Sequence, residues 1–284
     1  MTRFYKLSGG GNDFIALVEP EYQPEAKTMR RWCRRGVSLG ADGLFLLRQT
    51  SSGVAMEYFN SDGRPATLCI NATRCAARLA EHLSWAGPRL VVGTDAGDFG
   101  AELLDSTTAS VEAPLPSFPP RLTRLELGSD SLEGWSTEVG VPHFVSVIGE
   151  GLDNLDVDSL GARARSHPTF GAEGTNVDFI HLPSASRMSI RSFERGIEGE
   201  TLACGTGVLA AVAIAVGELG HRLPIEVTTR SGCRFEVDGE TENKAIRRWT
   251  LAGDARVVAE GILLEGADAL IEGADKADSK SDPC

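Results

Sequence analysis

Two cysteines, Cys69 and Cys204, stand in matching surroundings in the two halves of this chain. Each follows a phenylalanine, Phe59 or Phe193, by ten or eleven residues, and each follows a Thr-Leu pair by one or two. Internal repetition predicts two copies of one structural unit, related by pseudo-symmetry. Such an arrangement can place two sulfur atoms across one cavity, where one face of a carbon loses a proton and the opposite face receives one.

A second echo lies upstream of each cysteine. Gly-Asn-Asp-Phe-Ile at residues 11–15 resembles Thr-Asn-Val-Asp-Phe-Ile at 175–180. Around these motifs, short alternating stretches separated by turn residues run through both halves of the chain. This spacing is typical of curled antiparallel sheet.

A proline-rich stretch divides the chain, because four of the seven residues from 114 to 120 are proline and cannot continue a helix or a central strand. We therefore predict an N-terminal half at residues 1–115, completed by residues from about 256 to 272. The C-terminal half is predicted at residues 121–255. Residues 273–284 lack apolar periodicity and are predicted to form a disordered acidic tail.

Helical periodicity is confined to a few stretches, at residues 26–35, 70–83, 153–165 and 207–219. Two of these begin just after the paired cysteines. The helix from Gly207 is apolar nearly all round, which predicts a buried helix surrounded by sheet. A thiol at a helix N-terminus has its thiolate form stabilised by exposed N–H groups and by the helix dipole.

Composition excludes several classes of protein. The net charge of −12 argues against a nucleic-acid surface, and the longest apolar run, residues 208–216, is too short to span a membrane. The start of the chain lacks the apolar core of a signal peptide, so we expect a soluble protein in the reducing cytoplasm. The histidines are scattered singly and no Cys-x-x-C motif is present, so no metal site is expected. The six cysteines are residues 33, 69, 75, 204, 233 and 284.

The chemistry that suits two facing thiols is inversion of a carbon that carries hydrogen, a carboxylate and an amine. A base is needed on one face and an acid on the other, so one cysteine must be thiolate while the other stays protonated. The backbone N–H groups of the two helix starts can hold the substrate carboxylate and stabilise the charge that grows on it. These groups belong to Ile70, Asn71, Gly205 and Thr206. The scheme calls for neither a pyridoxal cofactor nor a metal.

Several motifs together resemble the diaminopimelate epimerase family of cofactor-independent amino-acid epimerases. They are Gly-Gly-Asn-Asp-Phe at 10–14, Gly-Ala-Asp-Gly-Leu at 40–44, the block 59–75, Pro-His at 142–143, Asn-Val-Asp-Phe at 176–179, Glu-Arg-Gly at 194–196 and Ala-Cys-Gly-Thr-Gly at 203–207. The resemblance extends from residue 4 to about residue 264. It implies an α+β fold of two similar domains, each a curled antiparallel sheet around a central helix, with the active site in the cleft between them.

The resemblance also implies roles for individual residues. Cys69 and Cys204 would be the acid/base pair, and His143 and Glu194 would bias the protonation of these thiols. The remote amino-acid end of the substrate would be bound by Asn12, Asn60, Asn176 and Arg195, with Glu194 also among the substrate-binding residues. The expected partner is a small amino-acid substrate, with no nucleic acid and no membrane; a homodimer is left open.

Two departures from the family pattern concern the substrate. The family's Cys-Gly-Asn-Gly is Cys-Ile-Asn-Ala at 69–72, which sets Ile70 beside the first thiol, and the family's Asn-Pro-His begins with Val141. The leading prediction is interconversion of LL- and meso-diaminopimelate, a step of lysine and cell-wall precursor synthesis. The alternatives are a racemase of another amino acid and a non-catalytic amino-acid-binding relative. The second alternative, and a phenazine-type isomerase, are disfavoured because neither needs both thiols.

Overall fold

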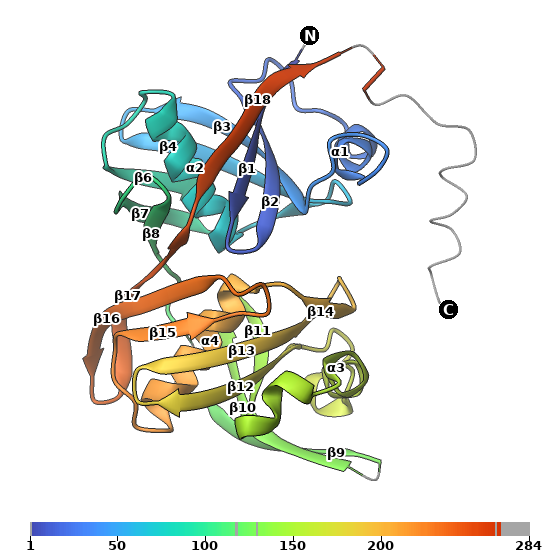
Figure 1. The fold of residues 1–284 in the computed structure, drawn as a ribbon, viewed down its shortest axis with the longest axis vertical. Coiled ribbons are helices and arrows are strands. Elements are labelled where there is room, and N and C mark those ends of the chain that lie inside the picture. Colours follow the sequence, from blue (N-terminus) through green and yellow to red (C-terminus); the bar gives the residue numbers. More distant parts are fainter. Residues whose placement is uncertain (1, 117–118, 129, 265, 268–284) are drawn as a thin grey trace.

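The computed structural model describes residues 2–116, 119–128, 130–264 and 266–267. The predicted tail at 273–284 lies outside the described residues. Two lobes are stacked along the long axis of the molecule (Figure 1). Most of each lobe is β-strand, with few helices, in keeping with the predicted α+β class.

The first lobe contains the strands that surround helix α2, with α1 on the outside. Its elements are β1 (Thr2–Gly9), β2 (Asn12–Val18), α1 (Ala26–Cys33), β3 (Gly43–Thr50), β4 (Gly53–Asn60), β5 (Pro65–Ala66), α2 (Ile70–His82), β6 (Arg89–Thr94), β7 (Gly97–Leu103), β8 (Thr108–Glu112) and β18 (Arg256–Leu263). Strand β18 belongs here because it pairs with β1. The last described strand therefore returns to the lobe where the chain begins.

The second lobe repeats this plan around helix α4. Its elements are β9 (Arg121–Leu127), β10 (Asp130–Val139), β11 (Val141–Val147), the 3-10 helix η1 (Gly149–Asn154), α3 (Val157–Arg165), the 3-10 helix η2 (Pro168–Phe170), β12 (Asn176–Ser184), β13 (Arg187–Glu194), β14 (Gly199–Thr201), α4 (Gly205–Gly217), β15 (Ile225–Thr228), β16 (Arg234–Glu242) and β17 (Ala245–Asp254). The stretch predicted as one helix at 153–165 is divided between η1 and α3. Asp156 caps α3 by accepting from the N–H of Ser159 at 3.1 Å.

Strand pairing shows that the two lobes are copies of one unit. The pair β2–β3 is parallel in the first lobe and β11–β12 is parallel in the second. The pairs β4–β6 and β13–β15 are likewise parallel, while the other described pairings are antiparallel. The pseudo-symmetry predicted from the cysteines is therefore present, and the sheets contain a few parallel crossovers that the sequence analysis did not predict.

The second sequence echo joins strands that are not equivalent. Residues 11–15 begin β2, whose counterpart in the second lobe is β11, whereas residues 175–180 run into β12. Both segments place an asparagine at the start of a strand that is buried further along. The two segments therefore resemble each other in sequence, although they do not occupy equivalent positions in the repeat.

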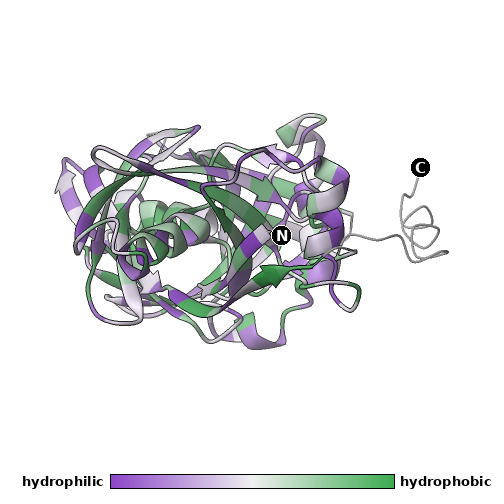
Figure 2. Ribbon diagram, turned by 90° about the horizontal axis from the view of Figure 1, so that it is seen from above, coloured by the Kyte–Doolittle hydropathy of each residue, from purple (hydrophilic) through white to green (hydrophobic). Residues whose placement is uncertain are grey.

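The central helices differ in composition although both are buried. Helix α4 is buried from Gly207 to Gly217 and carries no charged side chain, as predicted. Helix α2 is buried from Ile70 to Ala80 but includes two arginines, Arg74 and Arg78. Seen along the long axis, the strands curl around a helix that is coloured largely as hydrophobic (Figure 2). This burial fixes where each helix begins, and so where each cysteine lies.

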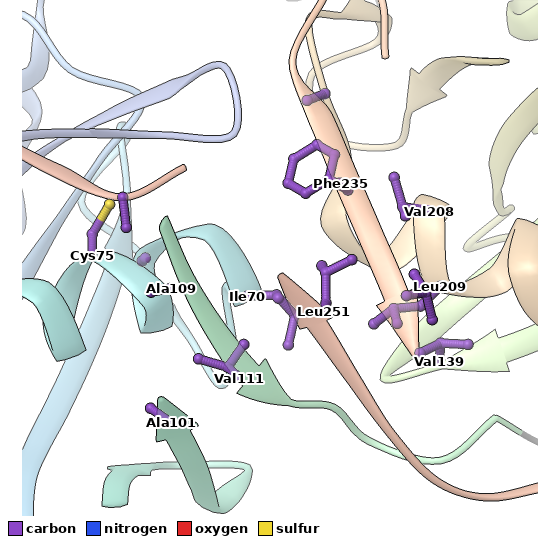
Figure 3. Close-up of a cluster of buried hydrophobic side chains, with 14 of the residues drawn as sticks. Ile70, Cys75, Ala101, Ala109, Val111, Val139, Val208, Leu209, Phe235 and Leu251 are labelled. Carbon is purple, nitrogen blue, oxygen red and sulfur yellow. The ribbon is translucent and has the colours of Figure 1, made fainter. Parts of the chain in front are cut away.

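The lobes are joined by a strand pair and by a shared hydrophobic core. Strands β8 and β17, which are equivalent in the repeat, pair antiparallel across the boundary, with Leu251 opposite Val111. Leu251 lies between Ile70 at the start of α2 and Leu209 on α4 (Figure 3). Because equivalent strands meet antiparallel, the pseudo-twofold axis passes between them.

Truncating this shared core is expected to destabilise the whole protein. Leu251→Ala removes a side chain that is 0% exposed, and such substitutions cost about 2–5 kcal/mol. The control is Leu122→Ala on β9, where the leucine is 59% exposed, and a change within about 0.5 kcal/mol is expected. Urea unfolding measures both; equal losses in the two variants would contradict a core shared between the lobes.

Candidate active site

The two paired cysteines occupy the same position in their lobes, immediately before the first residue of a central helix. Cys69 precedes α2 with φ −139° and ψ 106°, and Cys204 precedes α4 with φ −122° and ψ 110°. The backbone conformations agree closely, so the side chains leave the two helix starts in the same way. Both thiols are free.

The N-termini of α2 and α4 are in contact. A Cβ atom built on Gly205 would lie 3.3 Å from the Cβ of Ile70 and 3.3 Å from Oδ1 of Asn71. Glycine at 205 therefore leaves room for the first turn of the other helix.

A cavity of 680 Å³ opens at the contact and is lined by both lobes. The residues predicted for the site line it with the exception of His143, which is buried behind it. The predicted residues in the lining are Asn12, Asn60, Cys69, Ile70, Asn71, Asn176, Glu194, Arg195, Cys204, Gly205 and Thr206. Residues far apart in the sequence are thus brought to one place.

Unused backbone donors face the same region. The first hydrogen bonds of the helices run from Thr73 N to the carbonyl of Cys69 and from Val208 N to the carbonyl of Cys204. The N–H groups that precede them have no acceptor within the helix. Those of Ala72 and Gly207 lower the pKa values of Cys69 and Cys204. The N–H groups at 70, 71, 205 and 206 are left as a candidate anion site.

Burial opposes ionisation of the Cys69 thiol, whereas nearby polar groups favour it. Burial raises the pKa of this thiol above its ordinary value, while the Ala72 N–H, the Tyr58 hydroxyl and the nearby Arg74 guanidinium act in the opposite direction. Glu194, across the cavity, adds to the rise. The surroundings of Cys69 therefore favour its thiolate more than burial alone would.

Cys204 lies among acidic groups. Burial raises its pKa well above the ordinary value, and the charges of Glu194 and Asp178 raise it further. Glu194 has a raised pKa as well, mainly because it is buried, and accepts a hydrogen bond from Thr201. This environment favours the protonated form of Cys204.

A hydrogen-bonded relay joins the buried His143 to Cys204. Nδ1 of His143 lies 2.7 Å from Oδ2 of Asp178, and Nε2 lies 3.0 Å from Oγ1 of Thr206. Since a carboxylate can only accept, Nδ1 is the donor to Asp178. The Thr206 hydroxyl also lies 3.5 Å from Sγ of Cys204. The relay thus positions Thr206 beside the thiol, where its hydroxyl lowers the pKa of Cys204.

Two of the predicted asparagines are tied into the protein by their side chains. Asn71, only 2% exposed, donates through Nδ2 to Oδ1 of Asn12 at 2.7 Å. Asn176 accepts from the backbone N–H of Arg195 at 2.8 Å. The side chain of Asn71 is therefore directed at Asn12, and its backbone N–H is the part available to a ligand.

The remaining predicted residues lie at the outer part of the cavity. Arg195 is half-buried and Asn60 is exposed. Arg195 follows Glu194 in the cavity lining, and its side chain forms no hydrogen bond or ion pair with another side chain among the described residues. A positive and a negative group side by side suit an amino acid's carboxylate and ammonium groups.

The two departures from the family pattern have different consequences. Ile70 is 2% exposed and belongs to the core between the lobes, where its side chain packs on Gly205. The Ile70 side chain therefore contributes packing at the helix contact. Only its backbone N–H is available for the substrate binding that was expected of this residue. Val141 is half-buried and lines the cavity. The apolar surface that it adds is exposed to a ligand.

Asp178, Ser192, Tyr58 and Thr201 also belong to the site, although the sequence analysis assigned them no role. Asp178 and Ser192 are paired on adjacent strands and bonded at 2.6 Å. A signal was present, because polar residues alternate with phenylalanine or valine at Asn176 and Asp178 on β12 and at Ser192 and Glu194 on β13. Such alternation places polar side chains on one face of a sheet.

The sequence profile of the diaminopimelate epimerase family matches residues 4–114 and 135–258. The chain belongs to this family. It is 35% identical to the diaminopimelate epimerase of a Hydrogenobaculum species, over 91% of this chain and 97% of that protein, and 34% identical to that of Aquifex aeolicus, over 92% and 98%. The predicted family and enzyme class, an epimerase among the isomerases, are thereby confirmed.

Solved structures of low sequence identity share the fold. A PhzF-family phenazine biosynthesis protein of Bacillus anthracis has a TM-score of 0.70 and 14% identity, covering 93% of this chain and 99% of its own. A hydroxyproline epimerase of Agrobacterium vitis has a TM-score of 0.67 and 13% identity, covering 99% and 98%. The predicted fold class is confirmed, with a sheet that is curled and not closed.

The described residues include no group of three or more His, Cys, Asp or Glu side chains arranged to hold a metal ion. Over the same residues, no helix is long and apolar enough to cross a membrane.

Two buried cysteines outside the cavity predict how stability changes with pH. Burial raises the pKa of Cys33 and of Cys75 from 9.0 to about 12. Above about pH 9 the unfolded chain releases these protons while the folded protein keeps them. The free energy of unfolding therefore falls as pH rises above this value, by about 1.4 kcal/mol per pH unit for each thiol.

Urea unfolding from pH 9 to pH 11 tests this expectation. Cys75→Ala is expected to reduce the slope of stability against pH by about 1.4 kcal/mol per unit. Val92→Ala, which also truncates a buried side chain of the first lobe, should lower stability at every pH with the slope unchanged. Parallel lines for Cys75→Ala and the parent would contradict a raised thiol pKa.

Proposed function

We propose that this protein is a pyridoxal-independent diaminopimelate epimerase that interconverts LL- and meso-diaminopimelate, a step of lysine and cell-wall precursor synthesis. The observation that carries the proposal is the meeting of two helix N-termini, each preceded by a free cysteine, in one cavity lined by both lobes. Membership of the family and relatives of that name over nearly the whole chain support the substrate.

The reaction needs only the two thiols to move protons. The thiolate of one cysteine takes the α-proton, and the electron pair of the broken C–H bond passes to the α-carbon and its carboxylate. The thiol of the other cysteine then donates its proton to the opposite face, which inverts the centre. Protonation states are exchanged at the end of the turnover, so the same pair is poised for the reverse reaction.

The surroundings of the thiols support Cys69 as the resting thiolate and Cys204 as the resting thiol. Cys69 receives the help of a phenol and a guanidinium, whereas Cys204 lies against Glu194 and Asp178, which oppose its ionisation. His143 is a pKa-modulating residue in this scheme, because it holds Thr206 in place beside Cys204. Glu194 acts on the same thiol through its charge, which raises the pKa of Cys204.

The two ends of the substrate would be bound by different chemistry. The N–H groups of Ile70, Asn71, Gly205 and Thr206 would hold the reacting carboxylate and stabilise the charge that develops on it. The distal carboxylate and ammonium would be bound by the side chains of the outer cavity. These are Asn12, Asn60, Asn176, Glu194 and Arg195.

Exchange in deuterated water tests the function directly. LL-diaminopimelate is expected to gain deuterium at the α-carbon faster than ordinary L-amino acids do. Cys69→Ala and Cys204→Ala should each lower epimerisation at least about 100-fold, the contribution of a positioned acid or base, with circular dichroism unchanged. Cys33→Ala, a buried cysteine outside the cavity, is the control and should remain active. Equal turnover of several ordinary L-amino acids would instead favour a racemase of another substrate.

Val141 offers a test of substrate choice, since the family's asparagine would add an amide to the cavity wall. For diaminopimelate, Val141→Asn is expected to leave kcat/KM unchanged or to raise it by up to about tenfold, the contribution of one hydrogen bond. Val147→Asn lies on the same strand, outside the cavity lining, and should have no effect. A tenfold fall for diaminopimelate in Val141→Asn would indicate that the native substrate is less polar at this end.

We further propose a homodimer in the cytoplasm, built from two-domain subunits in which residues 1–115 with 256–272 and residues 121–255 form the domains. Strand β18 supports the dimer, because it pairs only with β1 among the described strands and exposes Val258 and Ile262. Light scattering should give twice the subunit mass of 30.2 kDa. A reducing compartment is supported by the free state of the catalytic pair, which oxidation to a disulfide would inactivate.

A further inference from the structure

A buried arginine on α2 acts on the chemistry above only through its charge, which lowers the pKa of Cys69. Arg74 is 0% exposed, and its Nη2 donates to Oδ1 of Asn71 at 2.7 Å. Nε and Nη1 have no hydrogen-bond partner in the part of the chain that the structure describes. A buried ion with so few partners contributes little to stability, and an apolar residue of similar volume is often as good. Packing alone therefore gives no reason for arginine here.

Arg74 stands at one end of a chain of hydrogen bonds that ends in the cavity. We call this chain, Arg74–Asn71–Asn12–Asp42, the amide relay. Asn71 accepts from Arg74 and donates to Oδ1 of Asn12 at 2.7 Å; Asn12 then donates through Nδ2 to Oδ2 of Asp42 at 3.2 Å. Three of its four members, Asn71, Asn12 and Asp42, line the cavity.

The two ends of the amide relay determine its direction. A guanidinium can only donate, and an ionised carboxylate can only accept. Asp42 also accepts from the backbone N–H of Asp13 at 3.0 Å and pairs with Arg35 at 2.8 Å, as expected of an ionised group. Turning either asparagine amide around would set donor against donor or acceptor against acceptor.

This direction decides what Asn12 offers to a ligand. Its carbonyl oxygen is occupied by Asn71, and its NH2 group uses one hydrogen on Asp42. The second hydrogen is left for the cavity. An asparagine held in this way recognises an oxygen acceptor and not an ammonium group.

We propose that Arg74 and Asp42 are positioning residues that fix the direction of the amide relay, so that Asn12 presents an N–H donor to the distal carboxylate of the substrate. The inference rests on the proposed function, which supplies that carboxylate. The relay also depends on the second lobe, because the ring of Phe235 on β16 covers the Arg74 guanidinium at 4.9 Å. Phe235 lies at the boundary between the lobes (Figure 3).

Kinetics of Arg74→Met test the inference. KM for diaminopimelate should rise by about tenfold or more, because a binding contact is misdirected. The value of kcat should fall as well, because Cys69 loses a positive charge that favours its thiolate. The inhibition constant of L-lysine, which lacks the distal carboxylate, should stay within about twofold. Arg74→Lys keeps one donor for Asn71 and should recover most of the affinity.

The matched control is Arg78→Met, one turn along the same helix. Arg78 is also buried, but it donates to the carbonyls of Ala255 and Thr108 and takes no part in the amide relay. Its loss should lower the melting temperature and leave both KM and the lysine inhibition constant within about twofold. A buried arginine that acts only through stability would give the same kinetics at both positions.

Three results would overturn the inference: an unchanged KM in Arg74→Met, an equal rise of KM in Arg78→Met, or an equal loss of lysine affinity. Failure of the parent protein to turn over diaminopimelate would instead reject the proposed function. In that case the amide relay is tested by a double-mutant cycle, in which the free energy of unfolding is measured for Arg74→Met, Asn12→Leu and the double variant. Non-additive changes in the free energy of unfolding support the relay, and additive changes reject it.

Discussion

The contact between the N-termini of α2 and α4 is the constraint on which the rest of the site depends. Each helix N-terminus carries about half a positive charge, so two of them pressed together repel one another unless an anion lies nearby. The protein holds them in place with the β8–β17 strand pair and with the packing of Ile70 on Gly205. In the proposed function, a substrate carboxylate that enters between them would relieve this repulsion.

Within a nearly symmetric frame, the two lobes supply different side chains. The first lobe places a phenol and a guanidinium near Cys69, and the second places two carboxylic groups near Cys204. Symmetry of the backbone gives each thiol the same approach, while the difference in charge favours ionisation of Cys69 over that of Cys204. In the proposed mechanism, a proton would be taken on one side of the cavity and returned on the other, and the direction would be reversed for the opposite isomer.

The features predicted well from sequence are those that depend on neighbouring residues. The cysteines, the helices after them and the buried character of α4 all follow from local pattern. The amide relay and the Asp178–His143–Thr206 relay depend on strands and helices that come together only in the folded protein. The role of Arg74 in particular cannot be predicted from its neighbours in the sequence. Ile70 illustrates the same limit, because its neighbour Gly205 lies 135 positions further along the chain and leaves the space that it fills.

The chain passes between the lobes twice. Strand β8 in the first lobe is followed by β9 in the second, and β17 in the second is followed by β18 in the first, with Ala255 alone between them. The two lobes are therefore joined along one edge, where β8 and β17 pair. Twisting or sliding would break that pairing, whereas opening about it would not. A relative movement of the lobes that kept this pairing would be a rotation about the β8–β17 strand pair.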